Sequence, residues 1–263
     1  MIGLLAPIFR GALAPHGEAL VCGTPPARAI PVAALTCASG PLNGILAHYA
    51  DHLGGGDDLR PVASLWSLAY LRALLPPMVA AASVLRHGFP ATAAEVWLEL
   101  DRHREPLRFY IAHEGASLGG ADIQARYAPL LQHHLEPLFA ELSRVSGLPR
   151  KVLWGNAARC LEPVFDQALA MLGPVPALLA DRRQLLELPV WHQRGDAGAG
   201  PSQLNPLHPR LRAPAHFTPA EAATLHRQCC LQYQLPRTGY CGACPLRPVP
   251  ADAAASAQDS TPA

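Results

Sequence analysis

Lysine is almost absent from this 263-residue chain, and charged side chains of both signs are scarce. Lys151 is the only lysine, charged residues make up 16% of the sequence, and the formal net charge is +1. Such a balance creates no strong field, and no basic helix-turn-helix is visible, so we expect no nucleic-acid partner. Half of the residues are hydrophobic, which is enough to build a sizeable core.

An export signal and a long apolar run are also lacking. Met1–Pro7 is apolar but has no basic region, and the longest apolar run, from Leu74 to Leu85, contains Pro76–Pro77. A spanning helix needs about 20 apolar residues. We therefore expect a cytoplasmic protein, with at most a peripheral contact to the inner face of the membrane. Seven cysteines in that compartment point to metal or redox chemistry rather than to disulfides.

Apolar residues at helical spacing dominate the middle of the chain. They predict four helices: one from Leu65 to Leu75 that Pro76–Pro77 should bend or interrupt, one capped by Asp122, one over 152–172 kinked at Pro163, and one over 177–188. The β-rich stretches 96–100 and 107–111 flank a polar turn and predict a hairpin. We predict a mainly α fold with a small antiparallel β element near residues 95–112.

Composition divides the chain into three parts. Residues 1–215 should form a mainly helical body, although 1–45 are poorly periodic and 191–215 look like a long loop. Residues 216–248 should form a C-terminal segment in which a helix capped by Thr218 runs into Cys229. Residues 249–263 should be a disordered tail.

Four cysteines near the C-terminus form the strongest signal in the sequence. Cys229 and Cys230 are adjacent, ten residues follow, and Cys241 and Cys244 form a C-x-x-C pair. Four thiolates can hold a 2Fe–2S cluster, whereas adjacent ligands suit a single tetrahedral zinc less readily. Structural zinc, disulfides and a Cys241–Cys244 dithiol pair remain alternatives at this point. The scattered Cys22, Cys37 and Cys160 are typical of inert buried thiols.

The segment from Arg227 to Leu246 resembles the C-terminal signature of the FhuF-type ferric-siderophore reductases. That family has an adjacent cysteine pair, ten residues and then C-x-x-C, as this chain has. Two weaker features agree with the resemblance: Trp66…Tyr70…Leu75-Pro76-Pro77 and Leu153-Trp-Gly-Asn-Ala-Ala158. Together they extend from Trp66 to Leu246, and the first sixty residues add little.

The resemblance implies an oxidoreductase with a 2Fe–2S cluster on Cys229, Cys230, Cys241 and Cys244, and no catalytic residue beyond these ligands. Its substrate would be a ferric siderophore, of the hydroxamate class, whose Fe(III) is reduced by one electron and released. Because no Gly-rich phosphate loop or Rossmann fingerprint is visible, the electron donor should be a protein such as a ferredoxin, flavodoxin or flavin reductase. Arg227 and Arg237 are candidates for stabilising the reduced cluster, and His226 is a neighbour rather than a ligand.

Two other functions stay open from the sequence. One is a non-catalytic iron–sulfur electron carrier or redox sensor, and the other is a zinc-stabilised module that binds siderophores. Trp66, Tyr70, Trp97 and Trp154 could line a siderophore cleft, although lone aromatics are more often core. Siderophore synthetases share broad similarity with the family, but no ATP-binding segment is visible here.

Overall fold

The computed structural model describes residues 1–195, 198–211, 214, 217–236 and 238–248, with the backbone alone for 192–195 and 198–202. The predicted tail, 249–263, lies outside the described residues. The first half contains η1 (Gly3–Leu5), η2 (Gly11–Leu13), α1 (Ala14–Glu18), β1 (Leu20–Cys22), β2 (Ile30–Pro31), α2 (Val32–Leu35), α3 (Leu42–Leu53), α4 (Leu59–Val79), η3 (Ala80–Leu85), β3 (His87–Gly88), β4 (Val96–Leu100), β5 (Pro106–Ile111) and β6 (Ala116–Ser117). The second half contains α5 (Ile123–Leu130), η4 (Leu131–Leu135), α6 (Glu136–Ser146), α7 (Arg150–Leu172), α8 (Pro176–Arg182), η5 (Arg183–Glu187), β7 (Val190–Gly195), β8 (Gly198–Leu204), α9 (Pro219–Thr224) and η6 (Gln232–Gln234).

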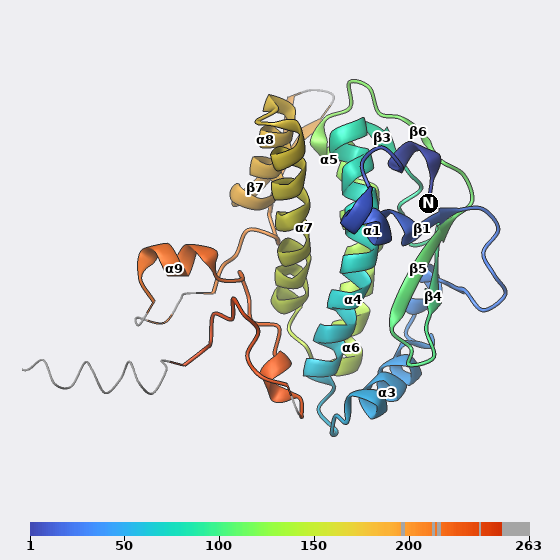
Figure 1. Cartoon of the computed structure of the whole chain (residues 1–263), viewed down its shortest axis with the longest axis vertical. Coiled ribbons are helices and arrows are strands. Elements are labelled where there is room, and N and C mark those ends of the chain that lie inside the picture. The colour runs from blue at the N-terminus through green and yellow to red at the C-terminus, as the bar shows by residue number, and fades with distance from the viewer. Residues whose placement is uncertain (196–197, 212–213, 215–216, 237, 249–263) are drawn as a thin grey trace, which may run out of the picture.

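Helix α4 is the centre of the fold, with α6 and α7 alongside it and the β4–β5 hairpin against another face (Figure 1). Its large side chains are buried all round, including Trp66, Tyr70, Leu71 and Leu74. Together with η3 it is long and apolar enough to cross a membrane, but 72% of its most apolar window is buried inside the fold. A helix that is hydrophobic on every side is the core helix of a protein this size.

Pro76–Pro77 were predicted to bend or interrupt this helix, and the interruption does not occur, because α4 passes through both prolines. Since proline has no N–H, the carbonyls of Arg72 and Ala73 lose their helical partners there. The helix continues as the wider π-helical turn η3. Helix α7 likewise runs as one element through Pro163.

The predicted hairpin is confirmed as β4 and β5, paired antiparallel in the centre of a four-stranded sheet. The sheet order is β1-β5-β4-β2, in which β1 lies parallel to β5 and β2 antiparallel to β4. The two edge strands come from the first 45 residues, where the sequence showed no clear periodicity. The mainly α fold with a small β element is therefore confirmed, with a wider sheet than predicted.

Two helix caps follow the sequence prediction. The N–H of Ala125 donates to the Asp122 carboxylate at 2.8 Å, and Thr218 with Glu221 forms a complete capping box at the start of α9. Two predictions for the same half of the chain are wrong. The stretch read as a long loop contains the β7–β8 hairpin, and α9 ends at Thr224 instead of reaching Cys229.

A buried histidine gives the body a measurable pH response. His134 is fully buried, its Nδ1 lies 3.0 Å from the Ala91 carbonyl, and its Nε2 lies 2.5 Å from the Tyr70 hydroxyl. This geometry suits a neutral ring that donates through Nδ1 and accepts through Nε2. Burial lowers the pKa of His134 to about 4.

We expect folding stability to fall on acidification through His134. An unfolded histidine takes up a proton near pH 6.5, while the folded one resists it down to about pH 4, so stability is lost as the pH falls through this window. The contribution is at most about 3 kcal/mol. Imidazole nitrogen shifts followed by NMR should show His134 neutral at pH 5.5. A midpoint near 6.5 would contradict the assignment, and His134→Gln should reduce the acid sensitivity of unfolding.

Candidate metal centre

The four predicted site cysteines lie in non-helical chain that folds back on itself. Cys229 and Cys230 follow the extended stretch after α9, and Leu231 then turns the chain with a left-handed backbone, φ 59°. At the second pair the N–H of Cys244 donates to the Cys241 carbonyl at 3.0 Å, which closes the C-x-x-C turn. The N–H of His226 donates to the Ala243 carbonyl at 2.9 Å, so the backbone ties one cysteine pair to the other.

The thiols meet across the two segments. The sulfurs of Cys230 and Cys241 lie 4.0 Å apart, and Cys229 interacts with Cys244. Cys229, Cys230 and Cys244 are buried, whereas Cys241 is partly exposed. In the described part of the chain, no three His, Cys, Asp or Glu side chains converge tightly enough to hold one metal ion. The structure thus presents two cross-segment pairs of thiols.

Backbone N–H groups point at the sulfurs. Leu231 donates to the Cys229 sulfur and Leu246 to the Cys244 sulfur, each at 3.4 Å. The hydrogen bond with Cys241 is the main cause that lowers the pKa of Cys230 to about 5, while burial raises the pKa of Cys229 to about 11. The lowered pKa of Cys230 and the N–H donors at Cys229 and Cys244 both suit a metal centre, because metals bind thiolates and such hydrogen bonds tune them.

Arg159, on α7, is a candidate functional residue that the sequence analysis missed. Its guanidinium lies 3.8 Å from the Cys241 sulfur, and it makes no ion pair among the residues the structure describes. Arg159 directly follows the Leu153–Ala158 motif, and this position was the feature of the sequence that could have pointed to it. Since this cation is 82 positions from Cys241 in the sequence, only the fold could bring the two together.

Arg227 makes structural contacts that the sequence did not indicate. Its side chain is buried, and Nε donates to Glu162 of α7 at 2.8 Å while a terminal nitrogen donates to the His208 carbonyl at 3.0 Å. Arg227 therefore fixes the cysteine segment to the helical body. The other candidate, Arg237, lies outside the described residues.

The Trp-Gly-Asn-Ala segment of α7 forms the surface on which the cysteine segment lies. A Cβ added to Gly155 would come within 2.4 Å of the Cβ and Cγ of Gln228, so only glycine admits this approach. Asn156 lies in mid-helix and donates to Ser64 and Ser67 of α4 at 2.9 to 3.1 Å. Asn156 lies past the start of α7, which begins at Arg150, and so faces α4 from within the helix.

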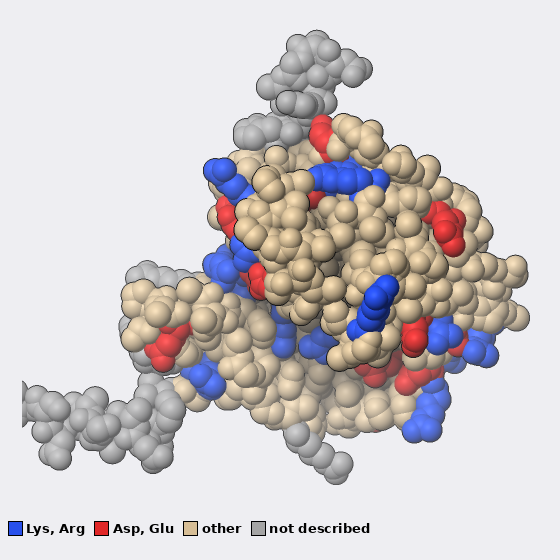
Figure 2. Space-filling view, turned by 45° about the horizontal axis from the view of Figure 1, so that its top comes forward, with Lys and Arg blue, Asp and Glu red and all other residues tan. Residues whose placement is uncertain are grey.

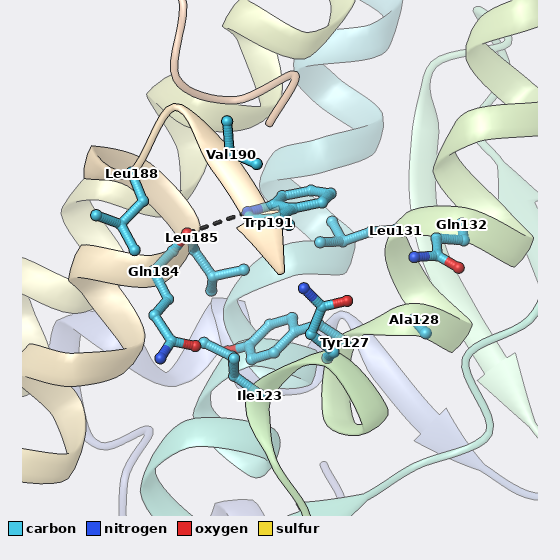
Figure 3. Close-up of a pocket in the computed structure, with 11 residues that line it drawn as sticks. Ile123, Tyr127, Ala128, Leu131, Gln132, Gln184, Leu185, Leu188, Val190 and Trp191 are labelled. Carbon is cyan, nitrogen blue, oxygen red and sulfur yellow. Dashed lines mark hydrogen bonds between the residues drawn. The ribbon is translucent and has the colours of Figure 1, made fainter. Parts of the chain in front are cut away.

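Two hollows in the described part of the structure differ in size and place. The smaller, about 100 Å³, lies between α5 and η5–β7, with the Tyr127 and Trp191 rings on its walls and the Trp191 indole bonded to the Gln184 carbonyl (Figure 3). The larger, about 420 Å³, includes Arg159 and His226 in its lining. Trp66, Tyr70 and Trp154 belong to the core and line neither hollow.

Charged side chains are dispersed on the face of the molecule shown in Figure 2. Basic and acidic residues alternate there over a mostly uncharged surface. Electrostatic attraction at this face is therefore local, between single residues, rather than a broad field.

The donor set at the cysteines fits a 2Fe–2S cluster. Four thiols in two pairs, with N–H donors and one guanidinium aimed at sulfur, provide the ligands and hydrogen bonds that such clusters use. Comparison with family models decides the relationship. The model described as "Ferric iron reductase FhuF-like transporter" matches residues 64–216, and the model described as "FhuF 2Fe-2S C-terminal domain" matches residues 227–246. The chain belongs to the FhuF family. Its C-terminal domain is a 2Fe–2S domain, so the cofactor predicted from the sequence is confirmed.

Individual relatives agree with the FhuF assignment. A ferric siderophore reductase of Escherichia coli (strain K12) is 23% identical over 253 residues, covering 92% of this chain and 91% of the relative. Aerobactin synthetase IucA of Klebsiella pneumoniae has a similar fold, with a TM-score of 0.54 at 16% identity, and its ATP-bound form gives 0.53 at 17%. Each match covers 68% of this FhuF-family chain and only 37% of the synthetase, so the likeness concerns the fold alone.

Proposed function

We propose that this FhuF-family chain is a cytoplasmic ferric-siderophore reductase that delivers one electron to chelated Fe(III), with Cys229, Cys230, Cys241 and Cys244 as the ligands of its cluster. The observation that carries the proposal is that these four thiols form two pairs across two chain segments on the helical body. When bound, a 2Fe–2S cluster supplies one electron at a time, and an all-thiolate ligand set favours a low potential.

The reaction needs little from the protein beyond binding and electron delivery. Fe(III) plus one electron gives Fe(II), which the hard anionic oxygens of a hydroxamate hold much more weakly, so iron is released without cleaving the chelator. No proton transfer is required at the metal. The partly exposed Cys241 marks the side of the centre at which a substrate or donor can approach. The donor we propose is a ferredoxin, a flavodoxin or a flavin reductase, in the cytoplasm or at the inner face of the membrane.

The first test is metal analysis of protein purified without oxygen. We expect about two irons and two sulfides per chain, and a spin-half resonance after reduction by dithionite. The reduced protein should then convert a ferric hydroxamate to Fe(II), detected with a chromogenic Fe(II) chelator. One zinc without sulfide would favour a zinc-stabilised binding module. A cluster without turnover of any ferric chelate would favour an electron carrier or sensor.

Arg159 should set the potential of the centre. Its guanidinium lies beside the Cys241 sulfur, and a positive charge there favours the reduced, more negative state. We expect Arg159→Gln to shift the midpoint potential to a more negative value, while Arg159→Lys retains much of the wild-type value. A redox titration followed by visible absorption measures both. An unchanged potential in Arg159→Gln would mean that the guanidinium contributes nothing to the centre's electrostatics.

A further inference from the structure

We propose that the 420 Å³ cavity beside Arg159 binds the apolar limb of the substrate, and that Arg72 and Arg159 bind its anionic end. The substrate class is then an anionic ferric chelate that carries an apolar chain. This inference rests on the proposed reductase function and adds the chemistry of the substrate. The cavity volume falls within the range of small-molecule sites, about 300–1,000 Å³.

The inner wall of the cavity is mostly apolar. It lies between the N-terminal segment, α4 with its π turn, and α7, and its lining includes Phe9, Pro76, Val79, Val164, Phe165 and Leu178. The exposed Met171 and Arg72 also line it, so the cavity opens to solvent. A hydrophilic chelate gains nothing from such a wall, whereas an aliphatic limb gains the transfer free energy of each buried methylene.

The mouth of the cavity is cationic. Arg72 and Arg159 both line it, and among the described residues neither guanidinium pairs with a carboxylate. The two charges act on common neighbours: both oppose the rise that burial causes in the pKa of Cys160, and both help to lower the pKa of His226. Burial is the main cause that lowers the pKa of His226 to about 4, so this ring is neutral at pH 7 and the arginines carry the charge. Among the described residues, two guanidinium groups that pair with no carboxylate thus lie at one mouth, and such groups suit an anionic ligand.

The cavity adjoins the candidate metal centre through two of its lining residues. Arg159 lines the cavity and also reaches the Cys241 sulfur at 3.8 Å. His226 lines the cavity, and its backbone N–H holds the C-x-x-C turn. A ligand whose anionic end meets Arg159 therefore brings its iron to the cysteines, while its apolar limb lies between α4 and α7.

The net charge of the ferric complex restricts the class of chelate that this site would bind. Three hydroxamates neutralise Fe(III), so a simple tris-hydroxamate complex carries no net charge and offers the two arginines no anionic group. A ferric hydroxamate with an additional carboxylate is anionic. The cavity thus favours a carboxylated ferric hydroxamate with an acyl chain over a neutral, hydrophilic one.

Calorimetric titration of the oxidised holoprotein, without an electron donor, tests the inference. The probes are ferric complexes of one carboxylated tris-hydroxamate bearing an acetyl, octanoyl or dodecanoyl group. We expect affinity to rise with chain length, by about fourfold for each methylene that the cavity buries. Arg72→Gln should weaken binding of all three complexes about tenfold or more. Arg183→Gln, an exposed arginine outside the cavity, should bind them as the wild type does.

A cavity-filling variant tests binding of the apolar limb separately from binding of the anionic end. Ala168→Phe places a ring in the cavity and should abolish the dependence on chain length, whereas Ala170→Phe, exposed on the same helix, should retain it. Circular dichroism establishes that both variants fold. Equal affinity for the three acyl lengths in wild type would overturn the proposal. So would equal affinity for dodecanoate or for the iron-free acylated chelator, which would make the cavity a lipid site.

The reductase function is tested separately in the same preparation. If wild type reduces the acetyl complex but binds all chain lengths equally, only the cavity assignment fails. If it reduces no ferric chelate at all, the reductase function fails.

Discussion

Gly155→Ala is expected to produce a folded helical body that holds much less iron and sulfide than the wild type. A Cβ at this position would come within 2.4 Å of Gln228 Cβ and Cγ, atoms that cannot move away without the backbone. Gln228 directly precedes the Cys229–Cys230 pair, so the shift is passed to the ligands. Overpacking of this kind costs about 1–3 kcal/mol, which outweighs the gain of about 1 kcal/mol from replacing glycine by alanine in a helix.

A double-mutant cycle distinguishes the clash with Gln228 from a general effect of the substitution on the helix. Gln228→Gly removes both atoms that meet the new methyl, and also the hydrogen bond from Gln228 Nε2 to the Pro209 carbonyl at 3.2 Å. Adding Gly155→Ala to Gln228→Gly should therefore cost little further iron, in contrast to its effect on wild type. Iron and sulfide per folded chain are the measured quantities.

Gly44→Ala is the matched control. Gly44 lies inside α3, and a Cβ there meets nothing within 4 Å. It should retain full iron content and gain slightly in stability from helix propensity. If Gly155→Ala also retained full iron content, the close contact between α7 and the cysteine segment would not be needed for loading.

This contact shows why the sequence predicted the centre better than its surroundings. The cysteine spacing could be read because all four ligands lie within sixteen residues of one another. Gly155 and Asn156 were visible only as a pattern, since their partners, Gln228 on one side and Ser64 and Ser67 on the other, are distant in sequence. Arg159 was missed for the same reason. In each case the missing information was a tertiary contact.

The fold errors have local causes. Pro76 and Pro77 predicted a bend or an interruption, but packing of α4 on all sides stabilises a continuous helix despite the lost hydrogen bonds. Strands β1 and β2 have three and two residues, too few for a period-two pattern to stand out, and they form only by pairing with the predicted hairpin. Strand propensity depends strongly on such neighbours.

Asp181→Asn is expected to destabilise the body by about 3–5 kcal/mol. The Asp181 carboxylate on α8 accepts from both terminal nitrogens of Arg126 at 2.6 and 2.7 Å and from the Ser83 hydroxyl at 2.8 Å. Both charged side chains are at least 95% buried. Removing the negative charge leaves the Arg126 guanidinium uncompensated in the interior, where its Nε already has no partner. Thermal unfolding should shift downward by roughly 10 °C.

Charge burial, rather than lost packing, is the cause we expect, and two variants test it. Arg126→Met combined with Asp181→Leu removes both charges and should unfold at a higher temperature than Asp181→Asn alone. Glu187→Gln, in the exposed pair with Arg182, should cost less than about 1 kcal/mol. If Asp181→Asn cost no more than Glu187→Gln, the buried pair would not stabilise the fold.

Asp181→Asn should alter the cavity and leave the metal centre intact. Ser83, which donates to Asp181, and Leu178, on the same helix α8, both line the cavity at a distance from the cysteines. Folded Asp181→Asn should therefore bind acylated ferric chelates more weakly while retaining its iron and sulfide, the reverse of what Gly155→Ala should do. Loss of iron from Asp181→Asn at a temperature where it remains folded would contradict this expectation. It would show that the cavity and the cysteine segment, which contact different parts of α7, are coupled.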